Sequence, residues 1–65
     1  MFKVKIRVRV ITGNTTRSGE FETMVDNSTW QKLSMSGSRD PILESWRGAF
    51  FTDADKIELM QRQKV

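Results

Sequence analysis

The chain has 65 residues, and its eleven Lys and Arg against eight Asp and Glu give a formal net charge of +3. It contains no cysteine and no histidine, which excludes a disulfide and argues against a structural zinc site. No segment approaches the roughly eighteen consecutive apolar residues of a membrane helix. We therefore expect one small domain over residues 1–65, in the cytoplasm, without metal or cofactor and without membrane contact. A homodimer stays open, because small domains often gain core by pairing.

The N-terminal segment alternates apolar and basic residues over nine positions. The apolar positions are Phe2, Val4, Ile6, Val8 and Val10, and the basic positions are Lys3, Lys5, Arg7 and Arg9. A period of two with many β-branched residues predicts a strand with one face in the core. The other face then carries four cations in a row, spaced about 6.6–6.8 Å apart along the strand.

A polar segment at positions 13–19 follows, with glycine at both ends, and it predicts a hairpin loop. The return strand is expected over positions 20–25. A register that places Val10 opposite Phe21 also places Arg9 opposite Glu22. In the same register Ile6 lies opposite Val25, so apolar residues face apolar residues, and Lys3 and Lys5 lie beyond reach of the glutamates.

Two short helical pieces are expected in the middle of the chain. Positions 28–31 fit a capping box that starts with Ser28, and this first piece ends near Met35. Asp40 and Pro41 predict a second start, and Gly48 is placed to end the second piece.

The C-terminal third has two interpretations. In the favoured one, positions 49–51 form a short strand, positions 52–55 form a turn, and Ile57 and Leu59 point to the core from a final strand. In the alternative, Thr52 begins a C-terminal helix. The predicted fold class is thus α+β, with a small antiparallel sheet made of an N-terminal hairpin and a C-terminal strand or hairpin, packed on one broken helical segment.

The residues that usually carry catalysis are scarce. Histidine, cysteine and tyrosine are all absent, and a small one-sided sheet has little volume for a cleft. Asp53 and Asp55 are spaced like metal ligands, but two carboxylates do not make a calcium loop, and duty in a turn suits them better. We therefore expect no enzyme activity.

The cationic row is the first functional hypothesis. Strand spacing near 6.7 Å is commensurate with the spacing of phosphates along one nucleic-acid strand. A regulatory or accessory module that binds nucleic acid, or another anionic surface, would use Lys3, Lys5, Arg7, Arg9 and Arg17. Cross-strand pairing of these cations with Glu20 and Glu22 is the alternative, as is protection of a sheet edge by lysines.

The second hypothesis is an inhibitor or adaptor that docks on a larger host protein, of the type that mobile genomes encode. Its contact residues would be Arg39, Trp46, Arg47, Phe50 and Phe51, since Trp beside Arg is typical of interface hot spots. Addition of a strand at a sheet edge is a further means of docking. Core anchoring is nevertheless the default role for both tryptophans, Trp30 and Trp46. The sequence carries no motif specific enough to choose between the partners.

Overall fold

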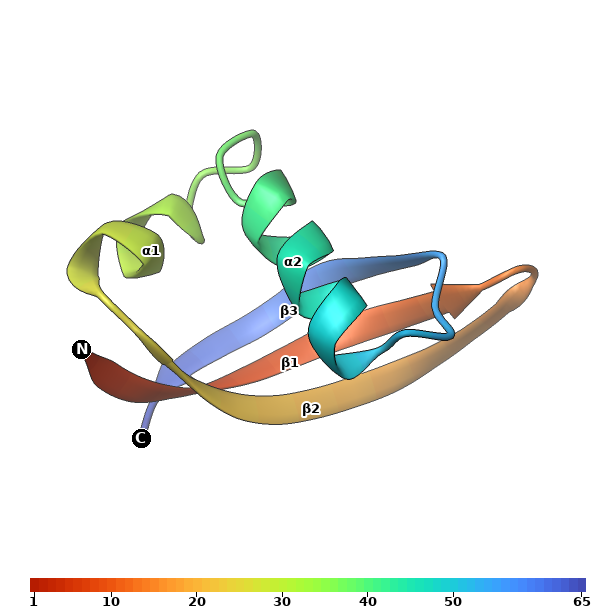
Figure 1. Ribbon diagram of the computed structural model, residues 1–65, viewed down its shortest axis with the longest axis horizontal. Helices are drawn as coiled ribbons and strands as arrows, with labels where there is room; N and C mark the ends of the chain where they lie inside the picture. The colour runs from red at the N-terminus through yellow and green to blue at the C-terminus, as the bar shows by residue number, and fades with distance from the viewer.

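The computed structural model describes residues 1–65 as three strands and two helices. In chain order these are strand β1 (Phe2–Thr12), strand β2 (Thr15–Val25), helix α1 (Asn27–Lys32), helix α2 (Asp40–Phe50) and strand β3 (Lys56–Lys64). The strands form one antiparallel sheet in the order β2-β1-β3, and both helices lie over the same face of it (Figure 1). The predicted α+β architecture is confirmed, and so is a final strand in place of a C-terminal helix. Neither helix is long and apolar enough to span a membrane.

The core is built on the apolar face of the central strand β1. Val4, Ile6, Val8 and Val10 are completely buried there. They pack with the other buried residues, which are Val25, Leu33, Leu43, Ala54 and Ile57. Removing these branched side chains from water is the main favourable term for a domain of this size. The predicted two-faced strand is thus confirmed.

The hairpin turn is much tighter than the sequence interpretation allowed. Only Gly13 and Asn14 connect the strands, and Thr12 pairs directly with Thr15. Gly13 has a φ of 58°, a conformation that glycine adopts without strain, and a positive φ at the first central position is the pattern of a type II′ turn. Such a turn matches the twist of the two strands, so that pairing begins at once.

This turn makes the predicted loop over positions 13–19 wrong, and the predicted register with it. Ile6 lies opposite Phe21 and not Val25, whereas Val10 lies opposite Arg17 and not Phe21. The shift is four residues. After this shift Phe21 still projects to the apolar face of the sheet, but different charged residues lie opposite one another.

The helix boundaries also differ from the prediction. The N-cap of α1 is Asp26, whose carboxylate accepts a hydrogen bond from the Thr29 amide at 2.7 Å, so Ser28 is not the cap. Helix α2 begins at Asp40 with Pro41 in its first turn. It continues through Gly48 to Phe50, and the short strand predicted at positions 49–51 is therefore wrong.

The turn between α2 and β3 is tied to the tip of the hairpin. The Asp55 carboxylate accepts a hydrogen bond from the Gly13 amide at 2.7 Å, and the Asp55 amide donates to the Ile11 carbonyl at 2.9 Å. Asp55 thus has the turn role that the sequence favoured, and the loop closes over the end of the sheet.

Gly19 lies inside β2 and not in a turn. A Cβ atom at this position would lie 2.9 Å from two ring atoms of Phe51 and 2.9 Å from a methyl carbon of Val10. Glycine in a strand interior often marks such a close approach. The Phe51 ring can cover β2 only because position 19 has no side chain.

We predict that Gly19→Ala destabilises the domain by about 1–3 kcal/mol, because the added methyl group overpacks this contact. Urea unfolding followed by tryptophan fluorescence measures the loss. Gly37→Ala is the control, since a Cβ there meets nothing within 4 Å. Equal stability of the two variants would contradict the assigned role of Gly19.

Candidate functional site

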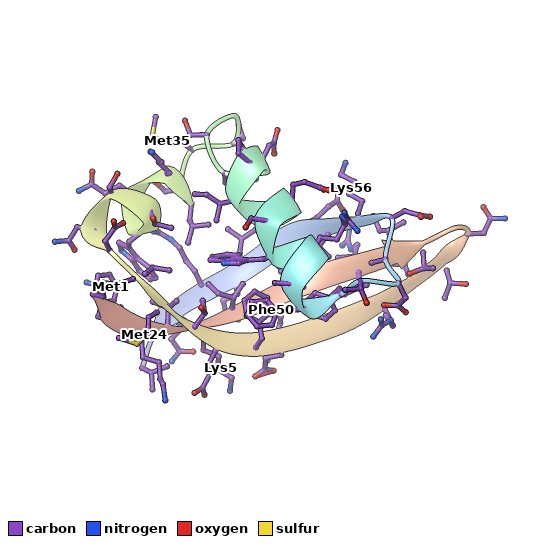
Figure 2. The ribbon with its side chains drawn as sticks, viewed as in Figure 1. Met1, Lys5, Met24, Met35, Phe50 and Lys56 are labelled. Atoms are coloured by element: carbon purple, nitrogen blue, oxygen red, sulfur yellow. The ribbon has the colours of Figure 1, made fainter.

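The face of the sheet that the helices leave open carries the predicted cationic row. Lys3, Lys5, Arg7 and Arg9 are about half exposed, and they extend along the central strand. Figure 2 shows Lys5 and Met24 on the side of the sheet opposite the helices. The structure therefore brings four of the five predicted phosphate-binding residues together.

Each of these four cations has a carboxylate of the same chain beside it. Lys5 Nζ lies 2.7 Å from Glu20 Oε1, and an Arg7 nitrogen lies 3.7 Å from Glu20 Oε2. The remaining pairs are Lys3 with Glu22 at 3.6 Å and Arg9 with Glu58 at 3.5 Å. The expectation that Lys3 and Lys5 escape the glutamates is wrong, because the two-residue turn moves both glutamates along the sheet toward them.

Arg17, the fifth predicted cation, does not join the row. It lies opposite Val10, a residue of the helix-covered face, and its guanidinium is 3.4 Å from Asp53. Together with the Asp55 bonds, this pair connects the hairpin to the turn before β3.

Glu20 is the electrostatic centre of the open face. The hydrogen bond from Lys5 holds the pKa of the Glu20 carboxyl below its ordinary value of 4.5, and the charges of Lys5 and Arg7 act in the same direction. The carboxylate therefore stays ionised to lower pH than an isolated glutamate. A hollow of about 30 Å³ on this face is lined by Lys5, Arg7, Glu20, Gln61 and Gln63. This volume is comparable to the space of about one water molecule.

An aromatic cluster lies on the other face, next to strand β2. Phe21 of β2 stacks on Phe50 with ring centroids 4.5 Å apart, and it meets Trp46 and Phe51 edge-on at 5.4 Å and 5.8 Å. Phe50 is the most exposed member, with 46% of its surface accessible. It lies beside β2 beneath the end of α2 (Figure 2). The structure thus gathers Trp46, Phe50 and Phe51, three of the predicted docking residues, around a fourth aromatic residue that the sequence had placed only in the core.

The two predicted docking arginines lie elsewhere. Arg47 binds Glu44 at 2.6 Å and donates to the Ala54 carbonyl at 3.0 Å, which links the end of α2 to the loop before β3. Arg39 donates to the Leu33 carbonyl at 3.4 Å. It lines a separate groove of about 430 Å³ between α2 and β3, together with Leu43 and Met60. The Arg47 carbonyl accepts a hydrogen bond from the Phe51 amide at 2.9 Å, so Arg47 supports the aromatic cluster through its backbone, whereas its guanidinium binds Glu44 and Ala54.

Trp30 anchors the opposite end of the sheet. It meets Phe2 edge-on at 5.8 Å, and the Arg62 guanidinium lies 4.1 Å from its ring centroid and donates to its carbonyl oxygen. Lys64 lies over both rings. Trp30 and Trp46 are partly buried against the core, so the default role of both tryptophans as core anchors is confirmed. Arg62 and Lys64 were not among the predicted contact residues, because no local pattern connects them with Trp30, which precedes Arg62 by 32 positions.

The two edges of the sheet are unlike each other. Strand β3 has an irregular register, in which Arg7 pairs with Gln61 and Val8 with Leu59, so that Met60 has no partner. It also carries lysines at both ends. A bulge and lysines are devices that discourage pairing with a further strand.

Strand β2 has none of these devices. It pairs with β1 without interruption over eleven residues, and it contains neither proline nor lysine. None of the backbone hydrogen bonds outside the helices and strands involves β2. Alternate amides and carbonyls along its outer side therefore point to solvent, in a row that another strand could pair with.

Comparisons of the chain with protein families, curated proteins and solved structures gave no match. The proposals below therefore depend on the geometry alone.

We predict that the domain loses stability in acid in a way that depends on Glu20 and Asp26. Hydrogen bonds from Lys5 and from the Thr29 amide, respectively, lower the folded-state pKa of each carboxyl. A group with a lowered pKa contributes stability above its ordinary pKa and loses that contribution as the pH falls through the folded value. Thermal melts between pH 7 and pH 2 should show this loss, and the double variant Glu20→Gln, Asp26→Asn should show a smaller one. An unchanged pH profile would contradict the prediction.

Proposed function

We propose that this protein is a small non-enzymatic module that binds a larger protein by accepting an extended segment at the outer edge of β2. The observation that carries the proposal is that the uninterrupted β2 edge, which has no bulge, proline or lysine, lies beside an aromatic cluster. Strand addition obtains affinity from main-chain hydrogen bonds and specificity from the side chains next to the edge. The proposal locates the protein in the cytoplasm, whose reducing conditions suit a chain without cysteine.

The aromatic cluster beside β2 also favours binding of a partner at this edge. Phe50 is 46% exposed although its ring already stacks on Phe21, so a partner that covers it gains apolar contact without rearranging the core. Trp46 also contacts the Phe21 ring, edge-on with centroids 5.4 Å apart. Aromatic side chains held in this way lose little conformational entropy on binding and are typical of interface hot spots.

We predict that Phe50→Ser abolishes capture of the partner while the fold persists, because Phe50 is a half-exposed residue at the end of α2. The measurement is affinity capture from a nuclease-treated lysate, with bound proteins identified by mass spectrometry. Met35→Ser is the matched control, since Met35 is 55% exposed but lies in the connection between the helices, away from β2. Capture that is equal for both variants would reject the aromatic cluster as the contact.

Binding of nucleic acid through the open face is the second candidate. The observation in its favour is that Lys3, Lys5, Arg7 and Arg9 are about half exposed, since exposed ion pairs are weak enough for phosphates to displace the carboxylates. Three carboxylates lie among these four cations, and they repel a phosphate backbone, which argues against this candidate. They belong to Glu20, Glu22 and Glu58.

The dependence of DNA affinity on salt concentration tests this second candidate. If the row neutralises four phosphates of duplex DNA, log K against log salt should have a slope of about −3.6, and Arg7→Gln should reduce its magnitude by about 0.9. Lys32→Gln, a change of equal charge on α1, should leave the slope unaltered. Our first proposal expects instead that the two variants behave alike. Fluorescence anisotropy with a labelled duplex is the measurement.

A further inference from the structure

The outer side of β2 presents different chemistry on its two faces. The last three side chains of β2 on the open face are Glu20, Glu22 and Met24. On the helix-covered face, Phe21 lies beside Phe50. Any strand added to this edge must match both faces at once, because its own side chains alternate in the same way.

The glutamates keep capacity for cations from the outer side. Glu22 uses only Oε1, at 3.6 Å from Lys3, and Glu20 divides its two oxygens between Lys5 and Arg7. Both side chains are more than a third exposed. A carboxylate has about four acceptor positions, so each can receive a further ammonium or guanidinium group from the side opposite β1.

Strand β1 shows which sequence pattern fits the inner side of β2. There the residues opposite Glu20, Phe21 and Glu22 are Arg7, Ile6 and Lys5, a basic, apolar, basic series. The outer neighbour meets the same three side chains. An outer strand is therefore favoured by positive charge on the open face and by apolar side chains on the helix-covered face.

A second copy of β2 fits this demand poorly. Antiparallel pairing about Phe21 would place Glu20 opposite Glu22 of the other copy, twice across the symmetry axis. Like charges directly opposite each other destabilise a sheet. Registers that avoid the clash give up the contact between the two phenylalanine rings and gain no ion pair.

We propose that the segment accepted by β2 alternates basic and apolar residues, with Lys or Arg opposite Glu20 and Glu22 and an apolar side chain opposite Phe21. This inference rests on the proposed function and names the chemistry of its partner. The site then consists of the β2 edge, its two glutamates and the Phe21–Phe50 pair.

The test uses three short peptides that alternate valine with lysine, with threonine or with glutamate. Each is titrated into the full-length ¹⁵N-labelled protein, and the shifts of the β2 amide signals report binding at this edge. The lysine peptide should bind best. The double variant Glu20→Gln, Glu22→Gln should weaken it by about two- to five-fold for each charge removed. Glu44→Gln removes one exposed carboxylate of α2, away from the edge, and should leave the affinity unchanged.

The outcomes separate this inference from the proposed function. Equal binding of all three peptides at β2 would overturn the charge preference and leave strand addition standing. Preference for the glutamate peptide would overturn the preference as well. Lysine-peptide shifts on the open face away from β2, or equal losses in the Glu44 variant, would show non-specific attraction and overturn it. No binding by any peptide, or dimer formation through β2 in sedimentation, would overturn both the inference and the proposed function.

Discussion

Burial of one face of β1 is the constraint on which the rest of the structure depends. Four branched side chains of this strand are completely inaccessible to water, and no other element contributes as many. Since β1 is also the central strand, its two neighbours and both helices are arranged to cover or extend it.

The same strand determines the character of the open face. Because side chains alternate, burying the apolar residues of β1 obliges its four cations to point to solvent. Glutamates from both neighbouring strands then surround them, and the face becomes a mixed-charge lattice instead of a positive patch. Such exposed pairs add little to stability, but they determine how strongly the surface attracts a polyanion.

The position of β2 at an edge gives the molecule its asymmetry. Its inner side completes the hairpin, whereas its outer side offers unpaired backbone beside an aromatic cluster that α2 brings into place. Gly19 and Phe51 show how closely the residue after α2 fits against β2, since one added carbon would lie 2.9 Å from the ring. Charge on one face of β2 and aromatic surface on the other together define what kind of strand could be added.

The sequence by itself determined the two-faced first strand, the α+β class and the final strand, because period-two alternation and turn residues are local signals. It also contained the tight turn, since Gly13-Asn14 between two threonines is a hairpin pattern, but the polar residues up to Gly19 obscured it. The register, and with it the partners of Lys3 and Lys5, came only from the folded hairpin. The aromatic cluster was likewise decided by tertiary structure, because Phe21 and Phe50 are 29 positions apart and meet only when α2 packs across the sheet. Helix α2 continues past Gly48, which local propensity favours as a stop, to Phe50, whose ring packs on Phe21 of β2. The start of α1, by contrast, depends on the local cap at Asp26.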